Sequence, residues 1–395
     1  MTENEVTILS PNPFYKLMYN TPLRSIIPAN RHTVTVPDTL PVTDVLALLH
    51  KHKILSVPVI RTAGGANKCL GFIDVLSILT HAINNGGGGG ASSHATVLVS
   101  RSSTHAHNAA AFLARITAAE VVKAASTDRL VPVFSENPVS MMVDFMSTGI
   151  HRVALFGRDR CLSSICSQSD LIAHINTIFN AAAAAAAAAH EGGGSPKLAA
   201  SEGGLAGVSA AALAATAPQI AAAGETLAST LGVFKPVETV AHTAPLIDVL
   251  QRFASQRRSA FAVVDEAGRL VCDVATSDLH DLTAKDGFPA LFASLDLPVL
   301  EWLKTYSSNQ LSPVCTTATS TLRQLVMALA GKRLHRLWVI DDDGKPTHLA
   351  SLTDVLAVFS SGDRVDARMA SGDTATTDLW SMEAGDAGGD STLRI

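Results

Sequence analysis

The sequence has few aromatic residues, little net charge and no paired cysteine motif. Phe, Trp and Tyr make up 5% of the 395 residues, and the formal net charge is −5. A balance this mild gives no reason to expect nucleic acid or an anionic membrane as the main partner. The five cysteines are scattered, without a Cys-x-x-Cys pair or a Cys/His cluster, which argues against a zinc site. We therefore expect reduced, buried thiols in a cytoplasmic or nuclear protein.

Motifs of several enzyme classes are missing as well. The 14 histidines form no His-Glu-x-x-His, and the chain has no Gly-x-Ser-x-Gly, P-loop or Gly-x-Gly-x-x-Gly. The first residues lack the basic and apolar regions of a secretory signal. The poly-Ala run at 181–189 is too short and too weakly apolar to span a bilayer. We expect a protein that is not an enzyme, has no metal or catalytic cofactor, and does not associate with a membrane.

Three segments have compositions that cannot bury enough apolar area to offset chain entropy. The first, from residue 84, is rich in Gly, Ser, Ala and His, although helical spacing at 109–126 indicates a possible helix. The second begins with poly-Ala at 181 and stays Ala/Gly-rich. The third is the polar tail from 361 onward. We interpret these segments as linkers and a disordered tail.

An interval of 19 residues recurs four times between them. It separates an early position from a later Asp, and in two cases the early position is the His of a His-Arg pair. The four pairs are Leu55 and Asp74, His151 and Asp170, Ser259 and Asp278, and His335 and Asp354. One interval kept across linkers of different length indicates an internal repeat.

The apolar pattern around the interval predicts the same elements in every block. Apolar residues stand ten, nine and six positions before the early residue, as Val249, Leu250 and Phe253 do in the third block. That spacing is one face of a helix. Apolar residues two and four positions after it, such as Phe261 and Val263, alternate as in a half-buried strand. A turn, a second strand and an apolar helix follow, so each block predicts strand, helix, hairpin and helix.

This pattern resembles the cystathionine-β-synthase (CBS) repeat, which pairs into Bateman modules. Four repeats with His-Arg in the second and fourth resemble the γ regulatory subunits of the AMP-activated and SNF-type protein kinases. The resemblance implies an α/β fold (α+β CBS repeats) of four βαββα repeats, paired into two modules. We place the repeats at 30–83, 128–180, 233–284 and 309–360, with linkers at 84–127 and 181–232 and the tail at 361–395.

The resemblance also implies where a ligand binds. In that family adenine nucleotides lie in clefts between paired repeats. An Asp at the start of the last helix accepts from the ribose hydroxyls, and basic side chains hold the phosphates. Carried over, the ribose-binding residues are Ser167, Asp170, Ser351, Asp354, Asp74 and Asp278. The phosphate-binding residues are His151, Arg152, His335 and Arg336.

The four blocks are not equally complete. The Asp is preceded three positions earlier by Ser in the second and fourth blocks, but by Gly71 and Ala275 in the first and third. We expect weaker or no binding in those two. Animal γ subunits carry Arg where this chain has Leu55, and they lack the counterpart of Asp170, so the occupied sites need not match. Ser-x-x-Asp is also a common helix cap, and an exposed His-Arg is often a solvated strand edge.

The resemblance implies a nucleotide sensor. AMP, ADP or ATP would bind in the CBS clefts and modulate a SNF-type Ser/Thr kinase, with its catalytic and β subunits as partners. Two alternatives stay open. One is a stand-alone scaffold whose repeats form a surface for other proteins. The other is a sensor of a different adenosyl ligand such as S-adenosylmethionine, which the ribose Asp would serve equally.

Overall fold

The computed structural model describes residues 12–28, 31–63, 66–85, 114–124, 133–157, 161–190, 205, 207–256, 258–279, 291, 294–307 and 311–361. Most of the linker expected at 84–127 lies outside these ranges, as does the tail after residue 361. Within that linker the structure describes one helix, α6 (Ala118–Ala124). It falls inside the stretch whose spacing predicts a helix.

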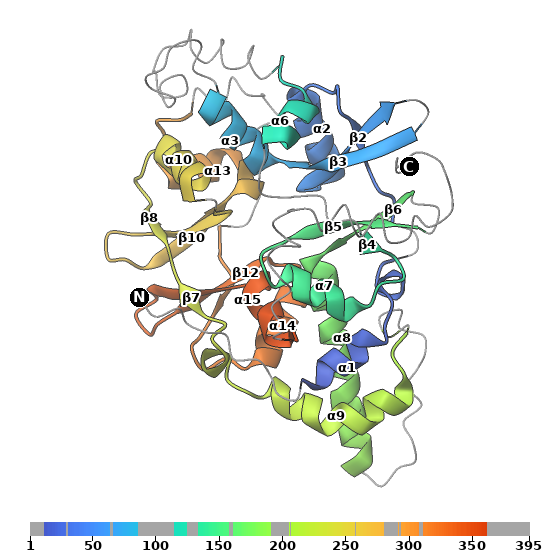
Figure 1. The fold of residues 1–395 in the computed structure, drawn as a ribbon. Coiled ribbons are helices and arrows are strands. Elements are labelled where there is room, and N and C mark those ends of the chain that lie inside the picture. The colour runs from blue at the N-terminus through green and yellow to red at the C-terminus, as the bar shows by residue number, and fades with distance from the viewer. Residues whose placement is uncertain are drawn as a thin grey trace.

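Four segments share the predicted order of elements (Figure 1). The first repeat has β1 (Val36–Pro37), α2 (Val42–His52), β2 (Ser56–Ala63), β3 (Ala66–Asp74) and α3 (Val75–Asn85). The second has β4 (Val133–Phe134), α7 (Val139–Met146), β5 (Arg152–Phe156), β6 (Leu162–Ser167) and α8 (Gln168–His190). The third has β8 (Thr239–Ala241), α10 (Leu246–Gln256), β9 (Ala260–Val264), β10 (Leu270–Ala275) and the 3₁₀ turn η3 (Thr276–Asp278). The fourth has β11 (Cys315–Thr316), α14 (Leu322–Gly331), β12 (Arg336–Ile340), β13 (Pro346–Ser351) and α15 (Leu352–Phe359).

Each repeat forms a small mixed sheet. The short first strand runs parallel to the second, and the second and third form an antiparallel hairpin. The predicted apolar positions of the third repeat, Val249, Leu250, Phe253, Phe261 and Val263, are all buried. The α/β fold class is therefore confirmed.

Sheets join the repeats within each module. Ile60, Cys69 and Phe72 of the first repeat form one apolar cluster with Ala154 and Phe156 of the second. A corresponding cluster joins the third repeat to the fourth through Ala260, Ala262 and Trp338. Burial of these faces pairs the first repeat with the second and the third with the fourth, because a single small sheet cannot cover both of its own faces.

Helices join the two modules to each other. The first and third repeats share one core with α6 and with α13 (Val299–Tyr306). The second and fourth share another with α1 (Pro13–Tyr19) and α9 (Ala210–Gly224). In Figure 1 the first of these helical layers lies at the top and the second at the bottom. The repeats therefore contact one another in a closed ring, in the order first, second, fourth, third.

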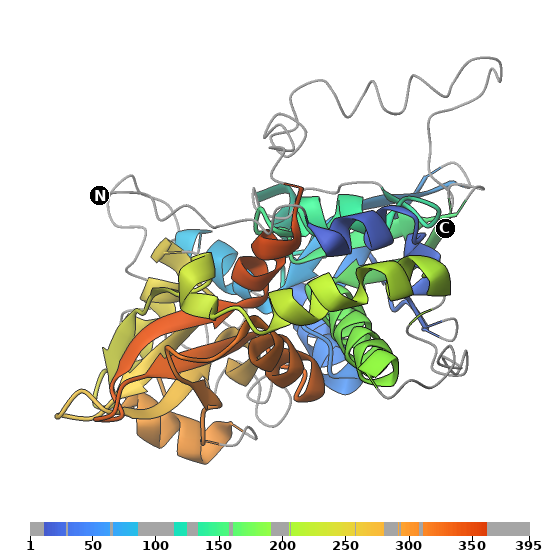
Figure 2. The same ribbon diagram turned by 90° about the horizontal axis from the view of Figure 1, so that it is seen from below.

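The linker expected at 181–232 is wrong for most of its length. The poly-Ala run continues α8 as far as His190, and α9 packs along it, as Figure 2 shows from below. Alanine has the highest helix propensity, and its small side chain lets two helices approach closely. Ala182 is fully buried, and a Cβ at Gly224 of α9 would lie 2.8 Å from the Phe179 ring. None of the described helices is both long and apolar enough to cross a bilayer.

Substitutions in the poly-Ala run test whether it packs as α8 shows. Ala182→Glu places a carboxylate in the core and should lower the free energy of unfolding by about 2 kcal/mol. Ala184 lies on the exposed side of the same helix, so Ala184→Glu should change it by about 0.5 kcal/mol or less. Urea unfolding of both variants measures the difference. Equal effects would mean that the run does not pack.

Candidate functional site

The two predicted His-Arg pairs lie close together. Each pair begins the second strand of its repeat, and both belong to the repeats that share the lower helical core. Loss of hydration, together with the positive charges of Arg336, Arg152 and His151, lowers the pKa of His335 to about 4. Charges influence one another this way only at short range. The charges of the other three predicted phosphate-binding residues therefore act on His335, and we refer to the four residues as the central basic cluster.

Both arginines of this cluster reach across to the partner repeat of their own module. Arg152 Nη1 donates to Ser56 Oγ of the first repeat. Arg336 Nη2 donates to Ser259 Oγ of the third repeat at 2.9 Å. Loss of hydration lowers the pKa of Arg336, and the charges of Asp273 and Asp278 oppose that shift. Each guanidinium thus contacts the other repeat of its own module, the first repeat for Arg152 and the third for Arg336.

The Ser-x-x-Asp motifs cap the helices that follow them. In the fourth repeat the Ser351 N–H donates to the Asp354 carboxylate at 3.0 Å, and the Asp354 N–H donates to Ser351 Oγ at 3.3 Å. The Ser351 hydroxyl also donates to this carboxylate. In the second repeat the Ser167 N–H and hydroxyl both donate to Asp170 Oδ2 at 2.8 Å. The helix-cap interpretation is confirmed for the fourth repeat, where both hydrogen bonds of a capping box are present, and in both repeats the serine fixes the carboxylate at the start of the helix.

Asp74 is not the structural counterpart of Asp170. Strand pairing aligns Ser56 with Asp74, whereas it aligns Arg152 with Ser167. The first-repeat hairpin is three residues longer, so Asp74 takes the place of Ser167 directly before its helix. Asp74 Oδ1 accepts from the Ser77 N–H at 2.7 Å, and the Asp74 N–H donates to Ser77 Oγ at 3.0 Å. The cap is reversed, Asp-x-x-Ser, and the assignment of Asp74 as equivalent to the other three aspartates is wrong.

Asp278 is the most enclosed of the four predicted carboxylates. It is 4% exposed and accepts from the Ala275 N–H at 2.7 Å. The Ser307 hydroxyl, after α13, donates to its other oxygen at 2.8 Å. Ala275 cannot supply the hydroxyl that Ser167 and Ser351 supply, and Ser307 provides one from a distant segment. Weaker binding in the first and third repeats stays a prediction.

Asp170 is held by an arginine that the motif analysis did not identify. Arg31 Nη2 donates to Asp170 Oδ1 at 2.6 Å, and Nη1 donates to Oδ2 at 2.9 Å. Nη1 also donates to the Ile165 carbonyl at 2.9 Å. The hydrogen bond to Asp170 raises the pKa of Arg31. This bidentate pair joins the segment before β1 to the helix start of the second repeat.

Asp354 accepts fewer hydrogen bonds from the described residues than Asp170 does. Hydrogen bonds from the described part of the chain reach its Oδ2 only, and both come from Ser351. Loss of hydration raises the pKa of Asp354, and the charges of Lys235 and Arg258 oppose the rise. Lys235 belongs to β7 (Lys235–Pro236), which extends the fourth-repeat sheet beside β13. A carboxylate with a spare oxygen and two nearby cations suits a ligand that carries both hydroxyls and phosphate.

The sequence does contain a signal for Arg31 and Lys235, but both residues lie upstream of the 19-residue interval that defines the repeats. Arg31 stands five positions before the buried Val36 of β1, and Lys235 stands five before the buried Val240 of β8. Extending the comparison of blocks toward the N-terminus would have aligned them.

The low pKa of His335 predicts a pH effect on stability. Between pH 6.5 and 4 the unfolded chain protonates this imidazole, because an ordinary histidine has a pKa of about 6.5, while the folded protein leaves it neutral. Stability should therefore fall as the pH is lowered through this range. His335→Asn should reduce the loss, as measured by urea unfolding at several pH values. His52→Asn, on an exposed part of α2, is the control; equal slopes in both variants would contradict the assignment.

Comparisons with known proteins identify the repeat. The CBS-domain family model matches residues 23–84, 230–282 and 308–361, which contain the first, third and fourth repeats. Subunit gamma-3 of the 5'-AMP-activated protein kinase of Bos taurus is 28% identical over 126 residues, covering 32% of this chain and 24% of that protein. The Arabidopsis thaliana SNF1-related protein kinase regulatory subunit gamma-like PV42b is 49% identical over 43 residues, 11% of this chain and 12% of that protein.

A solved structure supports the four-repeat arrangement. The crystal structure of a Methanocaldococcus jannaschii protein, described as a suggested archaeal homologue of the AMP-activated kinase γ subunit, has a TM-score of 0.59 at 14% identity. The match covers 86% of this chain and 100% of that one. The chain spans about a quarter or less of the two curated relatives above, so their similarity is partial. The predicted resemblance, CBS repeats similar to those of γ subunits, is confirmed.

Proposed function

We propose that this CBS-repeat protein, which resembles the γ subunits of AMP-activated protein kinase, is a non-catalytic regulatory subunit that binds adenine nucleotides. The observation that carries the proposal is the set of hydrogen bonds and charges around Asp354. There a carboxylate fixed by a helix cap keeps one oxygen available and has Lys235 and Arg258 nearby. Asp354 would accept from the ribose hydroxyls, and the cations would bind the phosphates.

The central basic cluster gives the second part of the proposed site. His151 and Arg152 come from one module, His335 and Arg336 come from the other, and the charges of the first pair act on His335. His335, with its low pKa, stays neutral at pH 7 and can either donate or accept a hydrogen bond. The two arginines carry the positive charge that phosphates require. Phosphates of a nucleotide bound in either module would meet the same cluster. AMP, ADP and ATP differ in phosphate charge, so they would bind with different affinities.

Regulation would follow from such differences in affinity. A ligand shifts a conformational equilibrium only by as much as its affinity differs between the two states. Two helical cores hold the two modules together in the ring. A nucleotide bound where the modules meet could therefore change their relative orientation. We propose the catalytic and β subunits of a SNF-type Ser/Thr kinase as the partners that respond. Support comes from the names of the curated relatives.

Isothermal titration of the full chain with AMP, ADP and ATP tests the proposal. Heat of binding and a raised melting temperature at millimolar nucleotide are expected, since a ligand that binds only the folded state stabilises it. The absence of both would reject nucleotide binding. A pulldown with and without nucleotide then tests the partner: recovery of kinase catalytic and β subunits supports the proposal.

A scaffold without ligand is the second candidate, and two observations favour it. The carboxylate of Asp170 is already paired with Arg31, and the first repeat has Ser77 where the others have Asp. A protein that had lost its ligand would tolerate both features. Recovery of partners that are unrelated to the kinase, and unaffected by nucleotide, would support this function instead.

A further inference from the structure

The contacts of Asp170 leave it little capacity to bind anything else. A carboxylate has about four acceptor positions on its two oxygens. Oδ2 accepts from the Ser167 N–H, the Ser167 hydroxyl and Arg31 Nη1, and Oδ1 accepts from Arg31 Nη2. The side chains are 31% exposed for Arg31 and 12% for Asp170, so the pair is largely shielded from water. A ribose could use this carboxylate only after the guanidinium had left.

The second module has a different residue at the corresponding position. β1 and β8 are equivalent strands, since Val36 pairs with Val59 and Val240 pairs with Val263. Five positions earlier they place Arg31 and Lys235 at corresponding points.

The far sides of the two contacts correspond as well. The Arg31 side chain donates to the Ile165 carbonyl, and the Lys235 backbone lies opposite Leu349 where β7 pairs with β13. Ile165 stands five positions before Asp170, and Leu349 stands five before Asp354. In both modules, therefore, the cation that precedes the first strand of the odd-numbered repeat lies beside the sheet that leads to the carboxylate of the even-numbered repeat.

Arginine and lysine act differently at this position. A guanidinium is a planar fork that matches both oxygens of a carboxylate, as Arg31 does with Asp170. An ammonium is a compact charge on a flexible stem, and it does not engage both oxygens in one plane. The hydrogen bonds from described residues accordingly leave Oδ1 of Asp354 available, although the charge of Lys235 is close enough to act on its pKa.

We propose that Arg31 closes the Asp170 cleft to nucleotides. The residue at this position then decides, in each module, whether the cleft of the even-numbered repeat accepts a nucleoside phosphate. Arg31 acts as an internal substitute for the ligand. It satisfies the carboxylate that would otherwise hold the ribose. Lys235 leaves the corresponding cleft open and adds a positive charge for the phosphate. The inference rests on the proposed function, because it presumes that Asp354 binds a nucleotide.

Exchange of the two cations in the full chain tests this inference. Arg31→Lys keeps the charge but gives the first module the residue of the second, and Arg31→Met removes the charge. Titration calorimetry with ADP should show one more site per chain in Arg31→Lys than in wild type. Asp170→Asn added to Arg31→Lys should remove the extra site. Lys235→Arg, the reciprocal exchange, should lose at least about tenfold in ADP affinity at Asp354.

The outcomes separate this inference from the function on which it rests. ADP binding by wild type with an unchanged number of sites in both Arg31 variants overturns the role of Arg31 and leaves the proposed function intact. Weaker ADP binding in Arg31→Met would make Arg31 a ligand contact and also overturn the closure. No binding by wild type or by any variant rejects both. Thermal unfolding of each variant confirms that the chain is folded in the titration.

Discussion

Asp354→Ala is expected to weaken ADP binding at least about 30-fold. The carboxylate is suited to accept from both ribose hydroxyls, and removing the charged partner of such hydrogen bonds costs about 2–5 kcal/mol. It would also leave Lys235 and Arg258 without the negative charge that they now face. Titration calorimetry at constant salt measures the change, because phosphate contacts depend on ionic strength.

Asp74→Ala is the matched control for this substitution. Asp354 also caps α15, so its loss lowers stability by about 1 kcal/mol in addition to its effect on the ligand. Asp74 caps α3 through Ser77 but does not occupy the corresponding carboxylate position. Asp74→Ala should therefore lower stability to a similar extent and leave ADP affinity unchanged. Equal losses of affinity in the two variants would show that cap stability, not ribose binding, explains the result.

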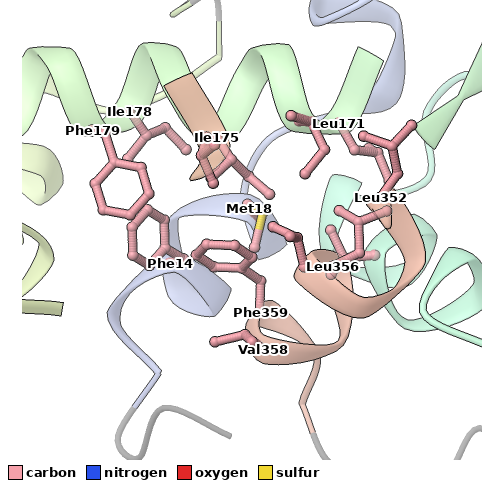
Figure 3. Packing of buried hydrophobic residues seen from close by; sticks show 14 of the residues in the cluster. Phe14, Met18, Leu171, Ile175, Ile178, Phe179, Leu352, Leu356, Val358 and Phe359 are labelled. Atoms are coloured by element: carbon pink, nitrogen blue, oxygen red, sulfur yellow. The ribbon is translucent and has the colours of Figure 1, made fainter. Parts of the chain in front are cut away.

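Phe359→Ala is expected to lower the free energy of unfolding by about 3–5 kcal/mol, the usual range for a buried Phe. Phe359 ends α15 and packs against Phe14 of α1 and Phe179 of α8, with ring centroids 4.8 and 6.2 Å away (Figure 3). All three rings are buried and meet edge to face, a favourable geometry for aromatic pairs. One substitution thus leaves a cavity that three helices share.

Tyr19→Ala provides the comparison for this core effect. Tyr19 is the last residue of α1 and is 62% exposed, so its removal should change stability by about 0.5 kcal/mol or less. Urea unfolding at pH 7 measures both variants. A loss below about 1 kcal/mol for Phe359→Ala would mean that α1 does not pack on the second and fourth repeats as the structure shows.

The repeat fold could be predicted from the sequence because local and global signals agree. The apolar spacing of α10 and β9 and the Ser-x-x-Asp cap of α15 each depend on residues a few positions apart. Counting along the chain is reliable where every copy has the same hairpin length. The proximity of the two His-Arg pairs was not predicted, since it depends on how repeats far apart in sequence pack.

The failures have physical causes too. The interval from Leu55 to Asp74 matched the others, but the longer hairpin of the first repeat moves Asp74 to the cap position. Residue counts cannot detect such a shift. The Arg31–Asp170 pair joins positions 139 residues apart, and nothing local to either residue signals it. The poly-Ala run was misinterpreted because low complexity was given more weight than helix propensity.

A crystal structure of the full chain with ADP is the most direct test of the account. It should show the ribose hydroxyls bonded to Asp354 and the phosphates directed toward Lys235, Arg258 or the central basic cluster, with Arg31 still paired to Asp170. A nucleotide bound at Asp170, with Arg31 displaced and the Asp354 cleft empty, would contradict it.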